Sequence, residues 1–331
     1  MADGAGRRWE PWRVATERAL YGPDGFYRRT AGPVAHFRTS VHASPLFAEA
    51  LLRLSLATGL RTVVDVGSGG GELLAQLHEW DPALRLVGVD VVERPDDLPA
   101  RVEWSAAVPE VDGGLLVANE WLDNVPLDVA VRTADGDRLV LVDPWTGVER
   151  ADGPLPARDA AWMDRWWPLR LNGDRSEIGR SRDTAWARAL DRLGSGIAVA
   201  VDYAHDAAHR PSRGTLTGYR EGRQVTPVPD GSCDVTAHVA LDACAEAGRR
   251  AGATETVLTT QRAALSALGV VAEQPDSASA SVDPGAYVAA MVRVGQLAEL
   301  RERGGLGDFG WLVQAFETPL PAALLGEQGQ L

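Results

Sequence analysis

The sequence predicts an α/β fold built on a doubly wound, mostly parallel sheet. From Thr62 onward, short runs rich in β-branched residues alternate with longer amphipathic runs: TVVDV, GELLAQLHEW, LRLVGVD, GLLVANEWL and, after DTAWARALDRLG, GIAVAVDY. Strands that are apolar throughout and separated by helices are typical of a parallel sheet covered on both faces. A chain of 331 residues that is 45% hydrophobic can bury such a core together with insertions or a second domain.

The core is expected to span residues 59–322, with insertions at about 128–182 and 205–237 that form a substrate subdomain. An N-terminal helical or loop segment, 1–58, covers the ligand site, and 323–331 is a tail. In the first insertion, LDVAVRTADGDRLVLVD predicts a β-hairpin that turns at ADGD, and a tryptophan-rich run follows it. We further expect a helix from about Val239, a strand at TETVLTT, helices ending near Leu268 and spanning 284–301, and a last strand at FGWLVQAFE.

The charge balance restricts the class of partner. The formal net charge is −13, which would repel nucleic acid and attract a basic peptide or a cationic ligand, although solubility alone is an alternative explanation. No apolar run is long enough to cross a bilayer and no signal-like segment follows the first arginines, so a cytoplasmic protein without membrane insertion is expected. Cys233 and Cys244 fit neither a metal-ligand spacing nor a disulfide framework.

A glycine-rich turn follows the first strand of the core. Gly67, Gly69 and Gly71 in VVDVGSGGGEL form GxGxG between a strand and a helix. A dinucleotide site has GxGxxG, but the third position here is Glu72, whose carboxylate in the first helical turn would repel a pyrophosphate. No GK[ST] follows, which excludes a P-loop. A turn that serves only close packing remains an alternative to a ligand site.

An acid ahead of the glycines, Asp65, completes the DxGxGxG signature of methyltransferases that use S-adenosylmethionine and have a Rossmann-like class I fold. That cofactor carries a cationic sulfonium and an ammonium group but no phosphate, so carboxylates near the loop are tolerated. Asp90 ends the next strand, where a carboxylate can accept both ribose hydroxyls. We therefore expect S-adenosylmethionine as cofactor and S-adenosylhomocysteine as product. The cofactor-binding residues predicted from this region are Asp65, Gly67, Ser68, Gly69, Gly71, Asp90 and Asn119.

Polar side chains follow the fourth strand in VANEWLDNVPLDV, namely Asn119, Glu120, Asp123 and Asn124. Ligands of open α/β sheets bind outside the carboxyl ends of the strands, so these groups should crowd the cleft. A helix cap at Asp123 or Asn124 is the alternative.

The chain resembles the MidA family, which includes the mitochondrial protein arginine methyltransferases that assist assembly of respiratory complex I. The blocks that carry the resemblance follow the family's order over most of the length: ALYGPDGFY, FRTS with ASPLFAEAL, VVDVGSGGGEL, VEWSAAVPEV with LLVANEWLDNVPLDV, AVDYAHD, RGTLTGYREGRQVTPVPDGSCDVTAHVALD and GLGDFGWLVQAF. His36 departs from the family's pattern before Phe37. Asp90 stands where glutamate is common, which preserves the ribose chemistry.

The resemblance implies N-methylation of an arginine guanidinium in a protein, with a respiratory complex I subunit as one candidate, and it adds Thr39 and Ser40 to the cofactor site. A guanidinium has a pKa above about 12, so its nitrogen becomes nucleophilic only if carboxylates hold the positive charge on the other nitrogens. Our hypothesis is that Glu120 and Asp123, together with Asp202, grip the guanidinium through bidentate hydrogen bonds.

Other residues complete the predicted site. His238 is the candidate that receives the proton, with Asp242 as a further acceptor-binding group, although a residue at a helix start can equally serve the backbone. Tyr203 and Tyr219 are expected to line the acceptor channel beside Asn124, with packing as the alternative. No metal is expected, because His205 and His209 have i, i+4 spacing without an evident third ligand.

Two other functions stay open. One keeps the cofactor and methylates a small-molecule or peptide natural product. The other is a non-catalytic assembly or binding factor, against which the intact Gly67, Gly69, Gly71 and Asp90 argue. The partner is thus a protein or peptide with a cationic side chain, or a small molecule, and not a nucleic acid. The sequence leaves the oligomeric state open, a homodimer included.

Overall fold

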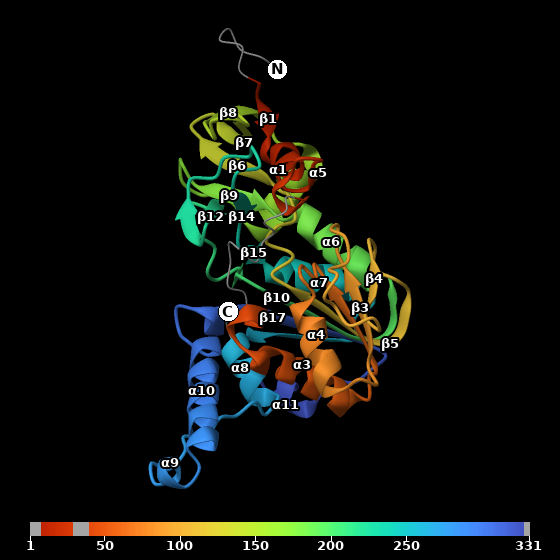
Figure 1. Ribbon diagram of the computed structural model, residues 1–331. Coiled ribbons are helices and arrows are strands. Elements are labelled where there is room, and N and C mark those ends of the chain that lie inside the picture. The colour runs from red at the N-terminus through yellow and green to blue at the C-terminus, as the bar shows by residue number, and fades with distance from the viewer. Residues whose placement is uncertain (1–7, 29–39, 328–331) are drawn as a thin grey trace.

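The computed structural model describes residues 8–28 and 40–327, and its centre is a seven-stranded sheet (Figure 1). In spatial order the strands are β16 (Glu255–Thr260), β17 (Gly310–Phe316), β10 (Leu193–Asp202), β5 (Val111–Asn119), β2 (Thr62–Val66), β3 (Arg85–Val89) and β4 (Glu103–Ser105). From β10 to β4 neighbouring strands pair in parallel, whereas β17 runs antiparallel to both of its neighbours. The doubly wound, mostly parallel sheet is confirmed.

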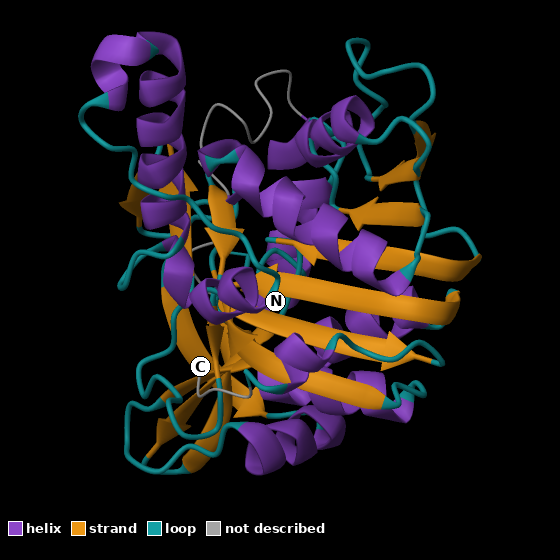
Figure 2. Cartoon of the chain, turned by 90° about the horizontal axis from the view of Figure 1, so that it is seen from below, coloured by secondary structure: helices purple, strands orange, loops and turns teal. Residues whose placement is uncertain are grey.

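Helices cover both faces of this sheet (Figure 2). The helices on one face are α3 (Pro45–Thr58), α4 (Glu72–Trp80) and α8 (Gln261–Ala267), and those on the other are α6 (Arg180–Leu190) and α7 (Leu241–Arg250). Phe47 and Leu74 are fully buried in the first layer, and Trp186 in the second. Because both faces are covered, a strand such as β17 is buried at every position, which explains the unbroken apolar runs in the sequence.

A second sheet consists of β1, from the N-terminal segment, and of four strands inserted between β5 and β10, with β6 and β7 at its centre. Its strands are β1 (Glu10–Pro11), β6 (Asp128–Thr133), β7 (Gly136–Val142), β8 (Glu149–Pro154) and β9 (Arg175–Ile178). Thr133 pairs with Gly136 across the turn, which confirms the hairpin at ADGD. β8 and β9 were not predicted, because ERADGP and RSEI lack the alternating apolar pattern of a strand. The buried Glu177 of β9 is satisfied instead by the backbone N–H groups of Thr215 and Leu216.

Smaller elements complete this half of the molecule. They are α5 (Ala157–Trp166), β11 (Ala204–His205), β12 (Thr217–Arg220), β13 (Arg223–Val225), β14 (Asp234–Thr236) and β15 (Val239–Ala240). β13, β12 and β14, in this order, form a third, smaller sheet. The helix expected from Val239 begins at Leu241, because Val239 and Ala240 pair with β11. Trp162 and Trp167 are buried in one apolar cluster against which Trp166 packs, as expected for packing residues.

Both terminal segments lie against this framework. α1 (Trp12–Tyr21) packs through Trp12 and Leu20 on the inserted sheets. It is followed by η1 (Phe26–Arg28) and α2 (Ser40–Ala43), and the C-terminal part adds α9 (Ser279–Val282), α10 (Pro284–Leu300), η3 (Leu306–Asp308) and α11 (Ala322–Leu325). α9 and the first part of α10 extend away from the sheet (Figure 1). Among the residues described, no helix combines the length and the apolar character that a bilayer crossing requires.

Candidate active site

A cavity of about 1250 Å³ lies where β2, β3 and β5 end. Residues that follow these strands line one side of it, and residues of the N-terminal segment and of the smaller inserted sheet line the other. The volume exceeds the range of about 300–1,000 Å³ that is usual for a small-molecule site. The cavity therefore has room for a cofactor and a second molecule.

The glycine turn presents bare backbone to this cavity. Gly67, Gly69 and Gly71 have φ angles of 75°, 56° and 76°, in the left-handed region that favours glycine. A Cβ on Gly67 would lie 2.8 Å from Trp121 Cδ1, whereas a Cβ on Gly69 would meet nothing within 4 Å. Gly67 and Gly69 line the cavity. Gly71 does not, and instead precedes α4 as its N-cap residue.

Two acids flank the turn. Ser68 Oγ donates to Asp65 Oδ2 at 2.8 Å, and the Gly69 N–H donates to Asp90 Oδ2 at 2.8 Å. Burial raises the pKa of Asp65 to about 7 and raises that of Asp90 as well. Within the described part of the chain neither acid has a salt bridge, so the only charge compensation comes from hydrogen-bond donors.

These residues fit S-adenosylmethionine. Asn119 Oδ1 is buried and has no hydrogen-bond partner among the described residues, so a donor on the ligand would satisfy it. Carboxylates suit a molecule that carries two cationic groups and ribose hydroxyls. The apolar side chains of Val91, Val92 and Val108 line the same cavity and suit an aromatic base.

Glu120 follows β5 with an unusual backbone conformation. Its φ angle is 50°, which is uncommon for a residue with a side chain and marks a position held by its surroundings. Its Oε1 accepts the Ser40 N–H at 3.0 Å and the Asn119 amide at 3.4 Å. Burial, with a smaller contribution from the nearby Asp123 carboxylate, raises the pKa of Glu120 to about 8.

Asp123 lies one turn further along and is 6% exposed. Its Oδ2 accepts the Thr236 hydroxyl at 2.7 Å, whereas Oδ1 is buried with no partner among the residues described. The buried guanidinium of Arg182 donates to the main-chain carbonyl of Asp123 and, at 2.8 Å, to that of His238. Burial raises the pKa of the Asp123 carboxyl group. The unpaired oxygen makes Asp123 ready to accept a hydrogen bond from a ligand.

The far wall of the cavity contains residues that the sequence analysis did not assign. The Tyr27 hydroxyl donates to Asp234 Oδ1 at 3.0 Å, and the Asn124 amide donates to the same oxygen at 3.1 Å. The Tyr21 and Tyr27 rings stack with centroids 5.5 Å apart. Burial raises the pKa of Asp234 to about 7. The signal was present in the quoted blocks ALYGPDGFY and DGSCDVT, but spacing alone did not connect them to the fourth strand.

Several predicted residues line the cavity together: Asp65, Gly67, Ser68, Gly69, Asp90, Asn119, Glu120, Asp123, Asn124, Tyr203 and Tyr219. Ser40 does not, because its N–H and hydroxyl groups bind Glu120 and Gln261. Thr39 lies outside the described residues. Asp202 is completely buried, and its Oδ2 accepts the backbone N–H groups of Leu122 and Asp123. The expectation that Asp202 grips the acceptor therefore does not agree with its position, which is beneath the loop that carries Asp123.

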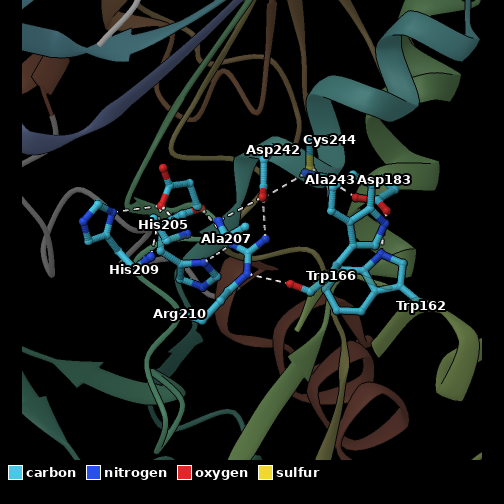
Figure 3. Close-up of polar contacts among 12 residues, drawn as sticks. Trp162, Trp166, Asp183, His205, Ala207, His209, Arg210, Asp242, Ala243 and Cys244 are labelled. Atoms are coloured by element: carbon cyan, nitrogen blue, oxygen red, sulfur yellow. Dashed lines mark hydrogen bonds and ion pairs between the residues drawn. The ribbon is translucent and has the colours of Figure 1, made fainter. Parts of the chain in front are cut away.

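Asp242 and His238 also lie away from the cavity lining. Both oxygens of Asp242 accept hydrogen bonds from the Arg210 guanidinium, at 2.6 and 2.7 Å (Figure 3). Arg210 also contacts Nδ1 of His205, which is buried, and burial lowers the pKa of His205 to about 2. The His238 ring stacks on Tyr203 with centroids 5.5 Å apart, so Tyr203 and not His238 faces the cavity. The predicted role of Asp242 with the acceptor does not fit its pairing with Arg210. The role of His238, which is exposed beside the lining residue Tyr203, stays a prediction.

Comparisons with known proteins agree with this site. The family described as "Putative S-adenosyl-L-methionine-dependent methyltransferase" matches residues 72–259. A COG1565 superfamily member from Burkholderia thailandensis, crystallised with S-adenosyl-homocysteine, is 27% identical with a TM-score of 0.78, over 99% of this chain and 90% of that one. A native crystal structure of a COG1565 superfamily protein from the same organism is 26% identical with a TM-score of 0.77, over the same shares. No curated protein matches the sequence.

The matched family, the ligand of the first solved structure and the lining of the cavity agree on the cofactor, which is S-adenosylmethionine. The class I methyltransferase fold and the enzyme class that the motifs indicated are confirmed, and the resemblance to the MidA family is consistent with both. The match covers more than half of the chain, and the chain therefore belongs to this family of S-adenosyl-L-methionine-dependent methyltransferases.

Proposed function

We propose that this methyltransferase acts on a guanidinium nitrogen of an arginine side chain in a protein. One observation carries the proposal. Glu120, Asp123 and Asp234 line one cavity, and among the described residues none of them forms a salt bridge with a cation of the chain. Arg182 attracts the Asp123 carboxylate from its position on the Asp123 carbonyl but donates no hydrogen bond to it. Buried acids whose carboxylate oxygens accept from no cationic side chain favour a ligand that brings the positive charge.

The acids are arranged to bind a planar cation. Asp123 Oδ1 is without a partner, and Glu120 Oε2 accepts no hydrogen bond from any described residue, so both oxygens are available to N–H donors of a guanidinium. Charge-assisted hydrogen bonds of this kind are strong and fix the orientation of the fork. Tyr203 and Tyr219 line the same space, where aromatic faces add attraction for a cation.

The chain's residues then promote transfer by orientation and charge. S-adenosylmethionine, when bound, supplies a methyl group on a positively charged sulfur. Glu120 and Asp123 hold the guanidinium so that one nitrogen points toward that methyl group, and orientation of two bound partners contributes roughly 7–11 kcal/mol. When the nitrogen bonds to the methyl carbon and the carbon–sulfur bond breaks, with S-adenosylhomocysteine as the neutral leaving group, Glu120 would accept the proton that this nitrogen releases. Without ligand, the pKa of Glu120 is about 8, so near neutral pH the carboxylate that accepts the proton forms only when the positive charges of the bound guanidinium and cofactor lower this pKa.

The second and third sheets are proposed to form a substrate subdomain, with insertions at about 128–182 and 205–237. Support comes from the cavity lining, because Asp234 and Thr236 of β14 and Tyr219 of β12 face the strand ends of the core across the same space. The N-terminal segment contributes Tyr21, Tyr27 and His42 to the lining. It is therefore proposed to cover the cofactor site. An enclosed, apolar cleft would favour the natural-product alternative, whereas the acids in this lining favour a cationic acceptor.

The acceptor is tested with matched peptides. The purified protein is incubated with labelled cofactor and an extract from cells that lack it, and the labelled sites are located by mass spectrometry. Peptides that carry the labelled sequence are then compared with the same peptides in which citrulline, a neutral isostere, replaces arginine. We expect label on arginine and none on citrulline.

A control variant distinguishes the effect of the cavity acids Glu120, Asp123 and Asp234 from the effect of the protein's net negative charge. Glu79 lies exposed on α4, so Glu79→Gln removes one negative charge outside the cavity and should leave methylation unchanged. Label on a small molecule with none on arginine would remove the proposed acceptor while leaving the methyltransferase class intact.

A further inference from the structure

We propose that Ser40 and Gln261 are positioning residues for Glu120, although neither lines the cavity. The proposal rests on the role that Glu120 has in the proposed function. It assigns a task to Ser40 at the start of α2 and to Gln261 at the start of α8, two residues that lie outside the cavity lining.

The first contact joins Ser40 to the acid. The Ser40 N–H donates to Glu120 Oε1 at 3.0 Å, and it is the shorter of the two hydrogen bonds that this oxygen accepts. Ser40 is the first residue of α2, where a backbone N–H has no partner within its own helix. The donor is therefore available for Glu120 without loss of a helical hydrogen bond.

The second contact fixes Ser40 in place. Ser40 and Gln261 are both 0% exposed, and Ser40 Oγ donates to Gln261 Oε1 at 3.2 Å. The Trp311 indole N–H donates to the same oxygen at 3.3 Å. Gln261 Nε2 donates to the carbonyl groups of Leu300 and Leu306 at 3.2 and 3.0 Å. With contacts to β17, the end of α10 and η3, the Gln261 amide has one defined orientation.

Glu120 needs such support because little else orients its carboxylate. Its main chain has a φ angle of 50°, and its other donor, the Asn119 amide, is at 3.4 Å. The Ser40 N–H stabilises the charged form of the acid and turns Oε1 away from the ligand, which leaves Oε2 for the acceptor. Loss of this donor should raise the pH at which Glu120 ionises and misdirect the carboxylate.

Two substitutions at Ser40 separate the two contacts. Ser40→Pro removes both the N–H, at a helical position where proline is tolerated, and the hydroxyl group, whereas Ser40→Ala removes only the hydroxyl group. The difference between the two variants therefore reports the N–H. A hydrogen bond to a charged group contributes about 1.5–3 kcal/mol, which corresponds to about 1–2 pH units. We expect Ser40→Pro to raise the titration midpoint of Glu120 by about that amount and Ser40→Ala to raise it by less.

The titration is followed by NMR of the full chain labelled at glutamate carboxyl carbons, with Glu120→Gln assigning the signal. Methyl transfer is measured in parallel, where we expect a fall in kcat with an almost unchanged KM for the cofactor. Ser279→Pro is the matched control, because Ser279 is also the first residue of a four-residue helix, α9. It should change neither quantity.

An unchanged Glu120 midpoint in folded Ser40→Pro protein would overturn the proposal, even if activity fell, because that result indicates a purely structural role. If Ser40→Pro does not fold, Gln261→Met decides: an upward shift of the midpoint supports the inference and an unchanged midpoint rejects it. Full turnover by Glu120→Gln would instead reject the proposed function, while the titration results would still stand on their own.

Discussion

Two regions of the molecule bury carboxylates, and they differ in the source of the positive charge. Around Asp242, the chain supplies its own cation, because Arg210 donates to both carboxylate oxygens and is anchored to the Trp166 carbonyl (Figure 3). At the cavity, Glu120, Asp123 and Asp234 receive only backbone, amide and hydroxyl donors from the described residues.

This difference separates a structural acid from a binding acid. In the Arg210–Asp242 pair the attraction offsets the cost of desolvation as the chain folds. At the cavity the cost remains, and burial raises the pKa of each acid. A cation that binds in the cavity offsets this desolvation cost by attracting the carboxylates. A site with unpaired buried acids can therefore favour a cationic ligand over a neutral one.

The largest expected effect comes from Glu120→Gln. The amide keeps the size of the side chain but can neither carry the charge nor accept the proton, so turnover should fall by roughly 100- to 10,000-fold. The cofactor affinity, measured by calorimetry, should stay within a few-fold. Turnover at the wild-type level would place the guanidinium-binding acids elsewhere.

The second-largest effect is expected in the pH dependence of the free energy of unfolding, to which the cavity acids contribute. The pKa is raised to about 7 for Asp65 and Asp234 and to about 8 for Glu120, so the folded state holds these protons more tightly than the unfolded state. Their contribution to stability is complete below the unfolded pKa of about 4 and is lost as the pH rises through about 7 and 8. Between about pH 6 and about pH 9 each aspartate should lose about 1.4 kcal/mol of this contribution and Glu120 about 2.7 kcal/mol, so the free energy of unfolding without ligand should fall by about 5 kcal/mol.

Chemical denaturation at several pH values measures this fall. S-adenosylmethionine should reduce it, because its positive charge favours the ionised acids. A flat profile, or one that is unchanged in Asp65→Asn and Asp234→Asn, would contradict the account of the cavity as an uncompensated acidic site.

Asp90→Ala should weaken cofactor binding by roughly 10- to 100-fold, which is the effect expected for the loss of hydrogen bonds to a charged group. Asp97→Ala, on the exposed part of the same loop, is the matched control and should bind normally. Calorimetry gives both values. Equal affinities would remove Asp90 from the cofactor site.

The smallest effect should follow from Arg210→Met. The pair is mostly buried, with exposed side-chain fractions of 9% and 18%, so removal of the cation should lower the free energy of unfolding by about 1–2 kcal/mol. Cofactor affinity should not change, because the pair does not line the cavity. A marked loss of cofactor affinity would show that the Arg210–Asp242 pair and the cavity are energetically coupled, which contradicts this prediction.

The fold was largely predictable from the sequence, because buried parallel strands and amphipathic helices have distinct periodicities. Gly67, Gly69, Asp90 and the acids after the fourth strand lie at the cavity, since strand ends of a parallel sheet meet at one edge. Their roles in binding and catalysis stay predictions. Polar strands were not predictable in the same way. RSEI of β9 is buried through hydrogen bonds to Glu177, which no local pattern indicates.

The remaining differences concern residues whose partners are distant in the sequence. In the sequence alone, Asp242 and Asp202 are typical candidates for binding an acceptor. The structure shows that Asp242 binds Arg210 and that Asp202 accepts backbone N–H groups. Asp234 and Tyr27 are 207 positions apart and become one feature only through the packing of α1 and η1 on the inserted sheets. Such pairings depend on tertiary structure and leave no signal in spacing.

The positive φ angle of Glu120 implies that folding stability and catalytic activity make opposite requirements at this position. A side chain in the left-handed region costs about 1–2 kcal/mol, a penalty that glycine does not have. Glu120→Gly should therefore increase the thermal stability of the protein and abolish methyl transfer. A screen for thermal stability alone would select this variant. Directed evolution of this chain toward thermostability should therefore also select for methyl transfer. Selection for stability alone would favour loss of Glu120, the residue that activity requires.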